Sequence, residues 1–209
     1  MKEALKSCDI LITNATYLDE DLCVCQAPGI AIKDGVITEI GACEGVQAGE
    51  RMDGEGLLWM PGLVDGHTHT SQQLLRGRLL DEKPVIWKRI NVPFEAELTE
   101  ETSELSAGVA ALEMIRSGTT GFLDAGGKYV PAFAKVYAQS GLRGRLSYMT
   151  NDNPGMPAAL RVEGEGALAR QIELHQMLGG GLLRATFSVT ALTAASEGLI
   201  RSMFSYAKE

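Results

Sequence analysis

The sequence predicts an α/β protein in which a small β region, residues 1–60, precedes alternating strands and helices over residues 61–209. In the first region, short apolar runs are separated by turn residues. In the second region, apolar runs alternate with segments of helical periodicity. The apolar fraction of 45% is ordinary for a globular protein. Alternation of this kind favours a parallel sheet with helices packed outside it.

The first region reads as a set of short strands. One begins at residues 10–12, and a short apolar run at residues 57–60 precedes the second region. Residues 29–33 and 36–40 flank Asp34-Gly35, a dipeptide that favours a tight hairpin turn. We therefore expect a small β domain of short strands here.

The second region contains four predicted strand–helix units. Gly118 and Gly141 follow two of the predicted helices, as expected for helix C-termini. A long polar connection, residues 70–98, separates the first strand from the first helix. Strands are predicted at residues 63–67, 119–123, 145–149 and 183–189, and helices at residues 99–117, 130–140, 164–178 and 196–208.

Charge and cysteine usage narrow the class of protein. The net charge of -8 argues against a nucleic-acid or anionic-membrane surface. No apolar run reaches the roughly 18 residues of a membrane span, and no signal core is evident, so we expect a cytoplasmic protein with no membrane partner. The cysteines, Cys8, Cys23, Cys25 and Cys43, lack the two spaced pairs of a structural zinc site. We expect them to be reduced and packed in the small sheet.

Two of the three histidines, His67 and His69, lie one residue apart at the end of an apolar run. Residues i and i+2 of a strand share a face, so the two imidazoles are predicted to lie side by side. Imidazole is a common metal ligand, and the pair would form half of a zinc-type site. The alternative is a hydrogen-bonded pair in a polar crevice. His175 lies within a predicted helix and reads as a surface or packing residue.

Residues 61–69, Pro-Gly-Leu-Val-Asp-Gly-His-Thr-His, resemble the first-strand metal motif of the amidohydrolase superfamily. The resemblance extends over the whole chain and is closest to the branch of cytosine deaminase-like enzymes. Within that branch it is closest to methylthioadenosine/S-adenosylhomocysteine deaminases and their chlorohydrolase relatives. The further matching segments are residues 74–77, Trp87, Pro93-x-Glu95, residues 98–101 and residues 117–120.

The resemblance implies a (β/α)8 TIM-type barrel with a small β-sandwich built from both chain ends. Residues 61–209 would form the first four β/α units, and residues 1–60 part of the sandwich. It also implies a divalent metal, zinc or alternatively iron, held by His67 and His69 together with histidines after strands five and six and an aspartate after strand eight. Such a metal lowers the pKa of bound water for attack on an amidine-like or amide carbon. A glutamate near strand five moves protons in these enzymes.

The later ligands and the general acid/base are expected outside this chain, since a complete barrel needs about 250 residues. We therefore expect hydrolysis of a C–N bond in a small molecule, most plausibly deamination of a nucleobase-like or heterocyclic amine. The alternative is a non-catalytic half-barrel, completed by a second chain that supplies the C-terminal half, or a truncated remnant. Dehalogenation or amide-ring hydrolysis by the same site is a third hypothesis.

Several residues are candidates for substrate contacts. The resemblance implies that Glu95 binds substrate hydroxyls, although it could be a solvated carboxylate near a helix start. Trp87 would line the pocket or pack the long loop, and Arg76 would pair with a buried carboxylate or a substrate anion. Thr190 occupies the place where the close deaminases carry a base-contacting histidine, which weakens the expectation of an adenosine-type substrate. Asp124, at the end of a strand, has a cap or turn role or faces the barrel mouth.

Overall fold

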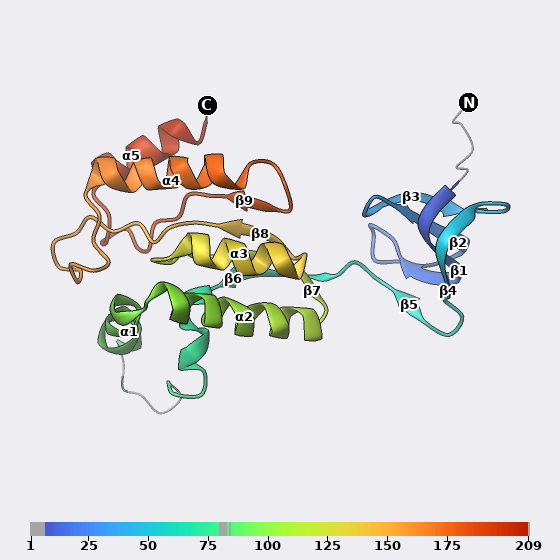
Figure 1. The fold of residues 1–209 in the computed structure, drawn as a ribbon, viewed down its shortest axis with the longest axis horizontal. Helices are drawn as coiled ribbons and strands as arrows, with labels where there is room; N and C mark the ends of the chain where they lie inside the picture. Colours follow the sequence, from blue (N-terminus) through green and yellow to red (C-terminus); the bar gives the residue numbers. More distant parts are fainter. Residues whose placement is uncertain (1–6, 80–82, 84, 209) are drawn as a thin grey trace. The chain divides into compact units, whose positions relative to one another are not determined.

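The computed structural model describes residues 7–79, 83 and 85–208. The chain divides into two compact units, Met1–Pro61 and Gly62–Glu209, each with its own sheet (Figure 1). None of the helices formed by the described residues is long and apolar enough to cross a lipid bilayer.

The first unit is a five-stranded sheet organised around β1 (Ser7–Leu18). This strand pairs antiparallel with β2 (Val24–Lys33) and parallel with both β4 (Gln47–Asp53) and β5 (Leu58–Trp59). Strand β3 (Val36–Gly41) completes the hairpin with β2. The predicted hairpin is thus confirmed, whereas β1 and β2, with 12 and 10 residues, are longer than the short strands expected.

The turn between β2 and β3 shows why the sequence contains Asp-Gly there. Asp34 and Gly35 have φ angles of +51° and +73°. Both central positions of a type I′ turn require positive φ, which aspartate tolerates and glycine adopts freely. The local sequence therefore sets the register of the hairpin.

The second unit is built on four parallel strands in the order β6-β7-β8-β9. Helices α2, α3 and α4 run alongside the strands (Figure 1). The strands are β6 (Leu63–Thr68), β7 (Thr119–Asp124), β8 (Arg143–Leu146) and β9 (Leu183–Ala185). The helices that follow them are α2 (Glu100–Arg116), α3 (Val130–Ser140), α4 (Gly164–Leu178) and α5 (Glu197–Tyr206).

The main core of this unit lies between the sheet and its helices. Phe122 of β7 and Leu146 of β8 pack with Phe133 and Tyr137 of α3, and all four are at most 4% exposed. Side chains on the opposite sheet face remain exposed, because successive strand residues point to opposite faces. The parallel sheet covered by helices on one face confirms the predicted α/β class.

The predicted helices agree closely with the structure because their ends carry strong signals. Thr99 caps α2, where its hydroxyl accepts from Thr102 N and its own N–H donates to the Thr102 hydroxyl. Gly118, after α2, and Gly141, after α3, have φ angles of +77° and +74°, the left-handed conformation expected just past a helix end.

Three features differ from the sequence prediction. Strand β4 was not predicted, because its sequence is polar. The connection over residues 70–98 contains a 3-10 helix η1 (Thr70–Leu75), a π-helix η2 (Trp87–Asn91) and α1 (Val92–Glu97). Strands β8 and β9 end earlier than predicted, at Leu146 and Ala185. Beyond Leu146 the chain forms an isolated bridge between Tyr148 and Gly127. Apolar runs alone therefore overestimated these two strands.

Candidate functional site

Two imidazoles meet at the carboxyl end of β6. The Nε2 atoms of His67 and His69 lie 3.1 Å apart, and the rings meet edge to face at 74°. The side-by-side arrangement follows from their i, i+2 spacing at the end of an extended segment. Two ring nitrogens therefore converge on one point.

The surroundings of His69 favour the neutral form of its imidazole. Burial lowers the pKa of its imidazole, and the neighbouring His67 adds to this effect. The neutral ring has a free lone pair, which is the form that binds metal ions.

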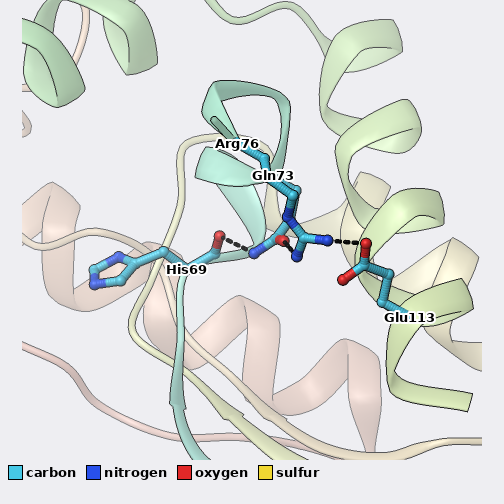
Figure 2. Close-up of polar contacts among 4 residues, drawn as sticks. All are labelled: His69, Gln73, Arg76 and Glu113. Atoms are coloured by element: carbon cyan, nitrogen blue, oxygen red, sulfur yellow. Dashed lines mark hydrogen bonds and ion pairs between the residues drawn. The ribbon is translucent and has the colours of Figure 1, made fainter. Parts of the chain in front are cut away.

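The backbone of His69 is fixed by a chain of contacts from η1 to α2 (Figure 2). Gln73 Nε2 donates to His69 O at 3.0 Å, and Arg76 donates to Gln73 Oε1 at 3.2 Å. Arg76 also forms an ion pair with Glu113 of α2, and both side chains are about half exposed. The expectation of a buried carboxylate as the partner of Arg76 is therefore wrong, because Glu113 is exposed. The His69 ring points away from this network.

Asp124, at the end of β7, organises the backbone next to the histidines. Its carboxylate accepts from Thr70 N at 3.0 Å and from Gly126 N at 2.6 Å. Burial raises the pKa of Asp124, while its hydrogen bonds from Thr70 and Gly126 oppose that rise. The expected turn role is therefore present, and Asp124 also lines the cavity described next.

A cavity of about 550 Å³ opens at this end of the sheet. It brings together five of the residues singled out in the sequence, namely His67, His69, Trp87, Asp124 and Thr190. The remaining wall is mostly apolar or small. It comprises Gln72, Leu123, Ala125, Met149, Thr186, Phe187, Ser188, Val189 and Ala191.

Glu95 lies behind the cavity wall. Its Oε1 accepts from Ser71 Oγ at 2.7 Å and from Gln72 Nε2 at 2.9 Å, and Gln72 itself lines the cavity. The residue is only 1% exposed, so the alternative of a solvated carboxylate is wrong. Burial raises the pKa of Glu95 against the opposing effect of these two hydrogen bonds. Its Oε2 has no hydrogen-bond partner among the described residues.

Sequence reasoning did not identify Ser71 and Gln72. Both lie in η1, directly after His69, and they are polar residues in what reads as an undifferentiated polar connection. Their contact with Glu95 spans more than 20 positions. The only sequence signal was their position next to the histidine motif.

Thr190 and Trp87 contribute opposite kinds of surface to the cavity. The Thr190 Oγ1 atom is buried and lacks a partner within the described part of the chain. Trp87 is 37% exposed and presents its ring from η2. The cavity therefore combines one unpaired hydroxyl with an aromatic wall.

Within the described residues, no group of three or more histidine, cysteine or acidic side chains is arranged to hold a metal ion. His175 is exposed on α4, as expected for a surface residue. His67 and His69 are thus the ligand-type pair that this unit brings together.

The chain was compared with known proteins. The model of the amidohydrolase family matches residues 58–209. A 5′-deoxyadenosine deaminase of Methanosarcina mazei is 41% identical over 143 residues, which cover 67% of this chain and 33% of the relative. A 5-methylthioadenosine/S-adenosylhomocysteine deaminase of Haloarcula marismortui is 32% identical over 96% of this chain and 46% of the relative.

Solved structures show the same fold. An adenosine deaminase from Xanthomonas campestris with bound zinc superposes with a TM-score of 0.84 at 23% identity, over 98% of this chain and 48% of the other. A guanine deaminase from C. acetobutylicum with bound guanine superposes at 0.79 and 17% identity. The chain thus spans a third to a half of the relatives it matches. Because the family model covers most of its length and includes the His67–His69 motif, the chain belongs to the amidohydrolase family.

Proposed function

We propose that the cavity is part of the active site of a metal-dependent hydrolase that cleaves C–N bonds other than peptide bonds. The observation that carries the proposal is the convergence of the His67 and His69 Nε2 atoms, 3.1 Å apart, in the wall of that cavity. The reaction we infer is deamination of a nucleobase-like or heterocyclic amine. In it, the oxygen of water replaces the amino group, which leaves as ammonia.

The donor set fits a divalent cation. Two neutral imidazoles with facing Nε2 atoms repel through their lone pairs unless a proton or a cation lies between them. Nitrogen ligands of this type suit zinc, with iron as the alternative. When bound, the metal would activate a water molecule for attack.

The rest of the cavity suits a flat, partly polar substrate. The Trp87 ring and the apolar wall would hold a planar heterocycle by stacking and exclude water from it. The unpaired Thr190 hydroxyl would hydrogen-bond to an edge of the ring. Glu95, which accepts a hydrogen bond from Gln72, would act through Gln72 or would bind substrate directly if Gln72 moves.

The deaminase activities named for the relatives support this reaction class. An adenosine-like substrate is less well supported for this chain, because Thr190 replaces the base-contacting histidine that the resemblance implies. A cytoplasmic location stays a prediction.

A second chain that completes the site also stays a prediction. His67 and His69 alone provide fewer than the three protein ligands of a typical catalytic zinc site. The other ligands would come from outside the described residues.

Zinc titration followed by ¹⁵N NMR of the histidine rings tests the ligand assignment. We expect the Nε2 resonances of His67 and His69 to shift together, while His175 on α4 stays unchanged. As a matched pair, His67→Ala/His69→Ala should lose the zinc-dependent change and His175→Ala should keep it. Equal shifts at all three rings would show adventitious binding and refute the assignment.

Ammonia release tests the reaction class. The zinc-supplemented protein would be assayed with adenosine, 5′-deoxyadenosine, guanine and cytosine. Turnover that survives His175→Ala and is lost in His67→Ala/His69→Ala supports a deaminase. Zinc binding at the two histidines without turnover of any amine would support the non-catalytic alternative instead.

A further inference from the structure

Thr70, the residue directly after His69, uses all of its polar groups in hydrogen bonds to three different elements. Its N–H donates to Asp124 Oδ2 of β7 at 3.0 Å, its C=O accepts from Ser106 Oγ of α2 at 2.6 Å, and its hydroxyl shares a hydrogen bond of 2.8 Å with the Tyr137 hydroxyl of α3. Thr70 and the two hydroxyl-bearing partners are fully buried. One residue therefore ties the chain next to His69 to β7, α2 and α3.

The backbone changes conformation at this point. Strand β6 ends at Thr68, and η1 begins at Thr70. His69 lies between them with extended φ and ψ angles of -118° and 92°. Thr68 is held as well, because its C=O accepts from Ala125 N at 2.8 Å. Since the backbone sets the direction in which a side chain leaves the chain, two anchored neighbours fix the direction of the His69 side chain.

The hydroxyl pair of Thr70 and Tyr137 does more than fill space. Valine and phenylalanine at these positions would remove both hydroxyls and leave no buried polar group without its partner, an exchange that can be nearly neutral for stability. A buried polar pair whose members satisfy each other also specifies one arrangement of the elements that it joins. The pair therefore adds orientation to the packing of α3 against η1.

We propose that Thr70 is a positioning residue that, supported by Ser106 and Tyr137, orients the His69 imidazole toward His67. This is the arrangement that the proposed metal site requires, so the inference rests on the proposed function. Contacts that orient ligand histidines typically contribute about 10- to 100-fold to metal affinity. The ring arrangement itself can be measured without a metal.

Two serines of α2 provide a matched pair of variants. Ser106 donates to Thr70 O, whereas Ser103, one helical turn earlier and equally buried, has an Oγ atom without a partner in the described part of the chain. The ring centroids of His67 and His69 lie 4.9 Å apart, close enough for a nuclear Overhauser effect between their ring protons. We expect Ser106→Ala to weaken that effect and to weaken zinc binding by about tenfold or more. Ser103→Ala should change neither.

A second set of variants separates orientation from stability. Tyr137→Phe leaves the buried Thr70 hydroxyl without this partner, so the urea midpoint of unfolding should fall. Tyr137→Phe/Thr70→Val removes both hydroxyls and should regain that stability. We expect the double variant to retain the weakened Overhauser effect and zinc binding. Thr70→Ser keeps the hydroxyl and should match the wild type in both.

The two measurements distinguish the positioning role from the metal site. If the wild type shows the Overhauser effect but zinc shifts neither histidine ring, the metal site is refuted, and the effect in the variants still decides whether Thr70 positions the ring. The positioning role is overturned if Ser106→Ala and Ser103→Ala behave alike. It is equally overturned if the Overhauser effect and zinc binding recover together with stability in the double variant, because Thr70 would then contribute to folding alone.

Discussion

Glu95 is a buried carboxylate without a cationic partner among the described residues. Two neutral donors, Ser71 Oγ and Gln72 Nε2, share one of its oxygens. Hydrogen bonds of this kind only partly offset the cost of burying a charge. The pKa of Glu95 is raised, so desolvation by burial has a larger effect on it than the two hydrogen bonds that lower it.

Stability should therefore depend on pH through Glu95. Because its folded pKa lies above the unfolded value of about 4.3, its contribution is fully present below that value and is lost as pH rises through the folded pKa. Glu95→Gln keeps the acceptor oxygen and removes the charge. We expect the variant to lose less stability than the wild type between pH 5 and pH 8.

Urea unfolding at several pH values measures this effect. Glu97→Gln, an exposed glutamate of the same helix, is the matched control and should follow the wild type. Parallel pH profiles for wild type and Glu95→Gln would show that Glu95 is not desolvated as described.

At the residue scale, the sequence predicted those side-chain positions that follow from the spacing of residues along a strand. The i, i+2 histidines needed only strand alternation to be placed side by side. The support of Glu95 could not be foreseen, because Ser71 and Gln72 reach it through a fold of the chain that no local pattern encodes. Trp87 was left open between pocket and packing, and only the cavity places it in the wall.

Strand β8 depends on a close approach between its backbone and an aromatic ring. A Cβ atom at Gly144 would lie 2.3 Å from Phe122 Cζ, within the main core. Gly144→Ala must displace Phe122, and overpacking of this kind costs about 1–3 kcal/mol. We expect that loss in the free energy of unfolding measured with urea.

Gly121, on the neighbouring strand β7, provides the control. The nearest atom to its added Cβ would be Val64 Cγ2 at 3.7 Å, an ordinary contact. Gly121→Ala should therefore change stability by only a few tenths of a kcal/mol. A similar loss in both variants would assign the effect to the strand backbone rather than to Phe122.

Helices whose ends carry a capping residue or a glycine were predicted well, whereas a strand without a recognisable sequence pattern was missed. Helices α2 and α3 have a capping box or a terminal glycine. Strand β4 has a polar sequence and exposed side chains, and its place in the sheet comes from backbone pairing with β1. Such a strand lacks the apolar alternation by which strands are recognised.

The two tryptophans, Trp59 and Trp87, lie in different units of the molecule. Each unit has its own hydrophobic clusters, so we expect two unfolding transitions rather than one. Trp87→Phe leaves fluorescence that reports the first unit, and Trp59→Phe leaves fluorescence that reports the second. Coincident thermal transitions in the two variants would show one cooperative molecule.

At the scale of the molecule, the division between a small sheet and a strand–helix region was evident from the change in residue pattern near position 60. The closeness of Arg145 and Arg184 was not, because alternate arginines on a strand also describe an ordinary solvated surface. Only the parallel pairing of β8 with β9 brings Arg145 and Arg184 together.

The order of pairing in the two sheets has a kinetic consequence. Strands β2 and β3 meet across a two-residue turn, so this hairpin closes in about 1–10 μs once both strands exist. Strands β6 and β7 are separated by some 50 residues of intervening chain, and their closure must await α2. On the ribosome, the first sheet is therefore complete in sequence and able to fold while the parallel sheet is still being synthesised.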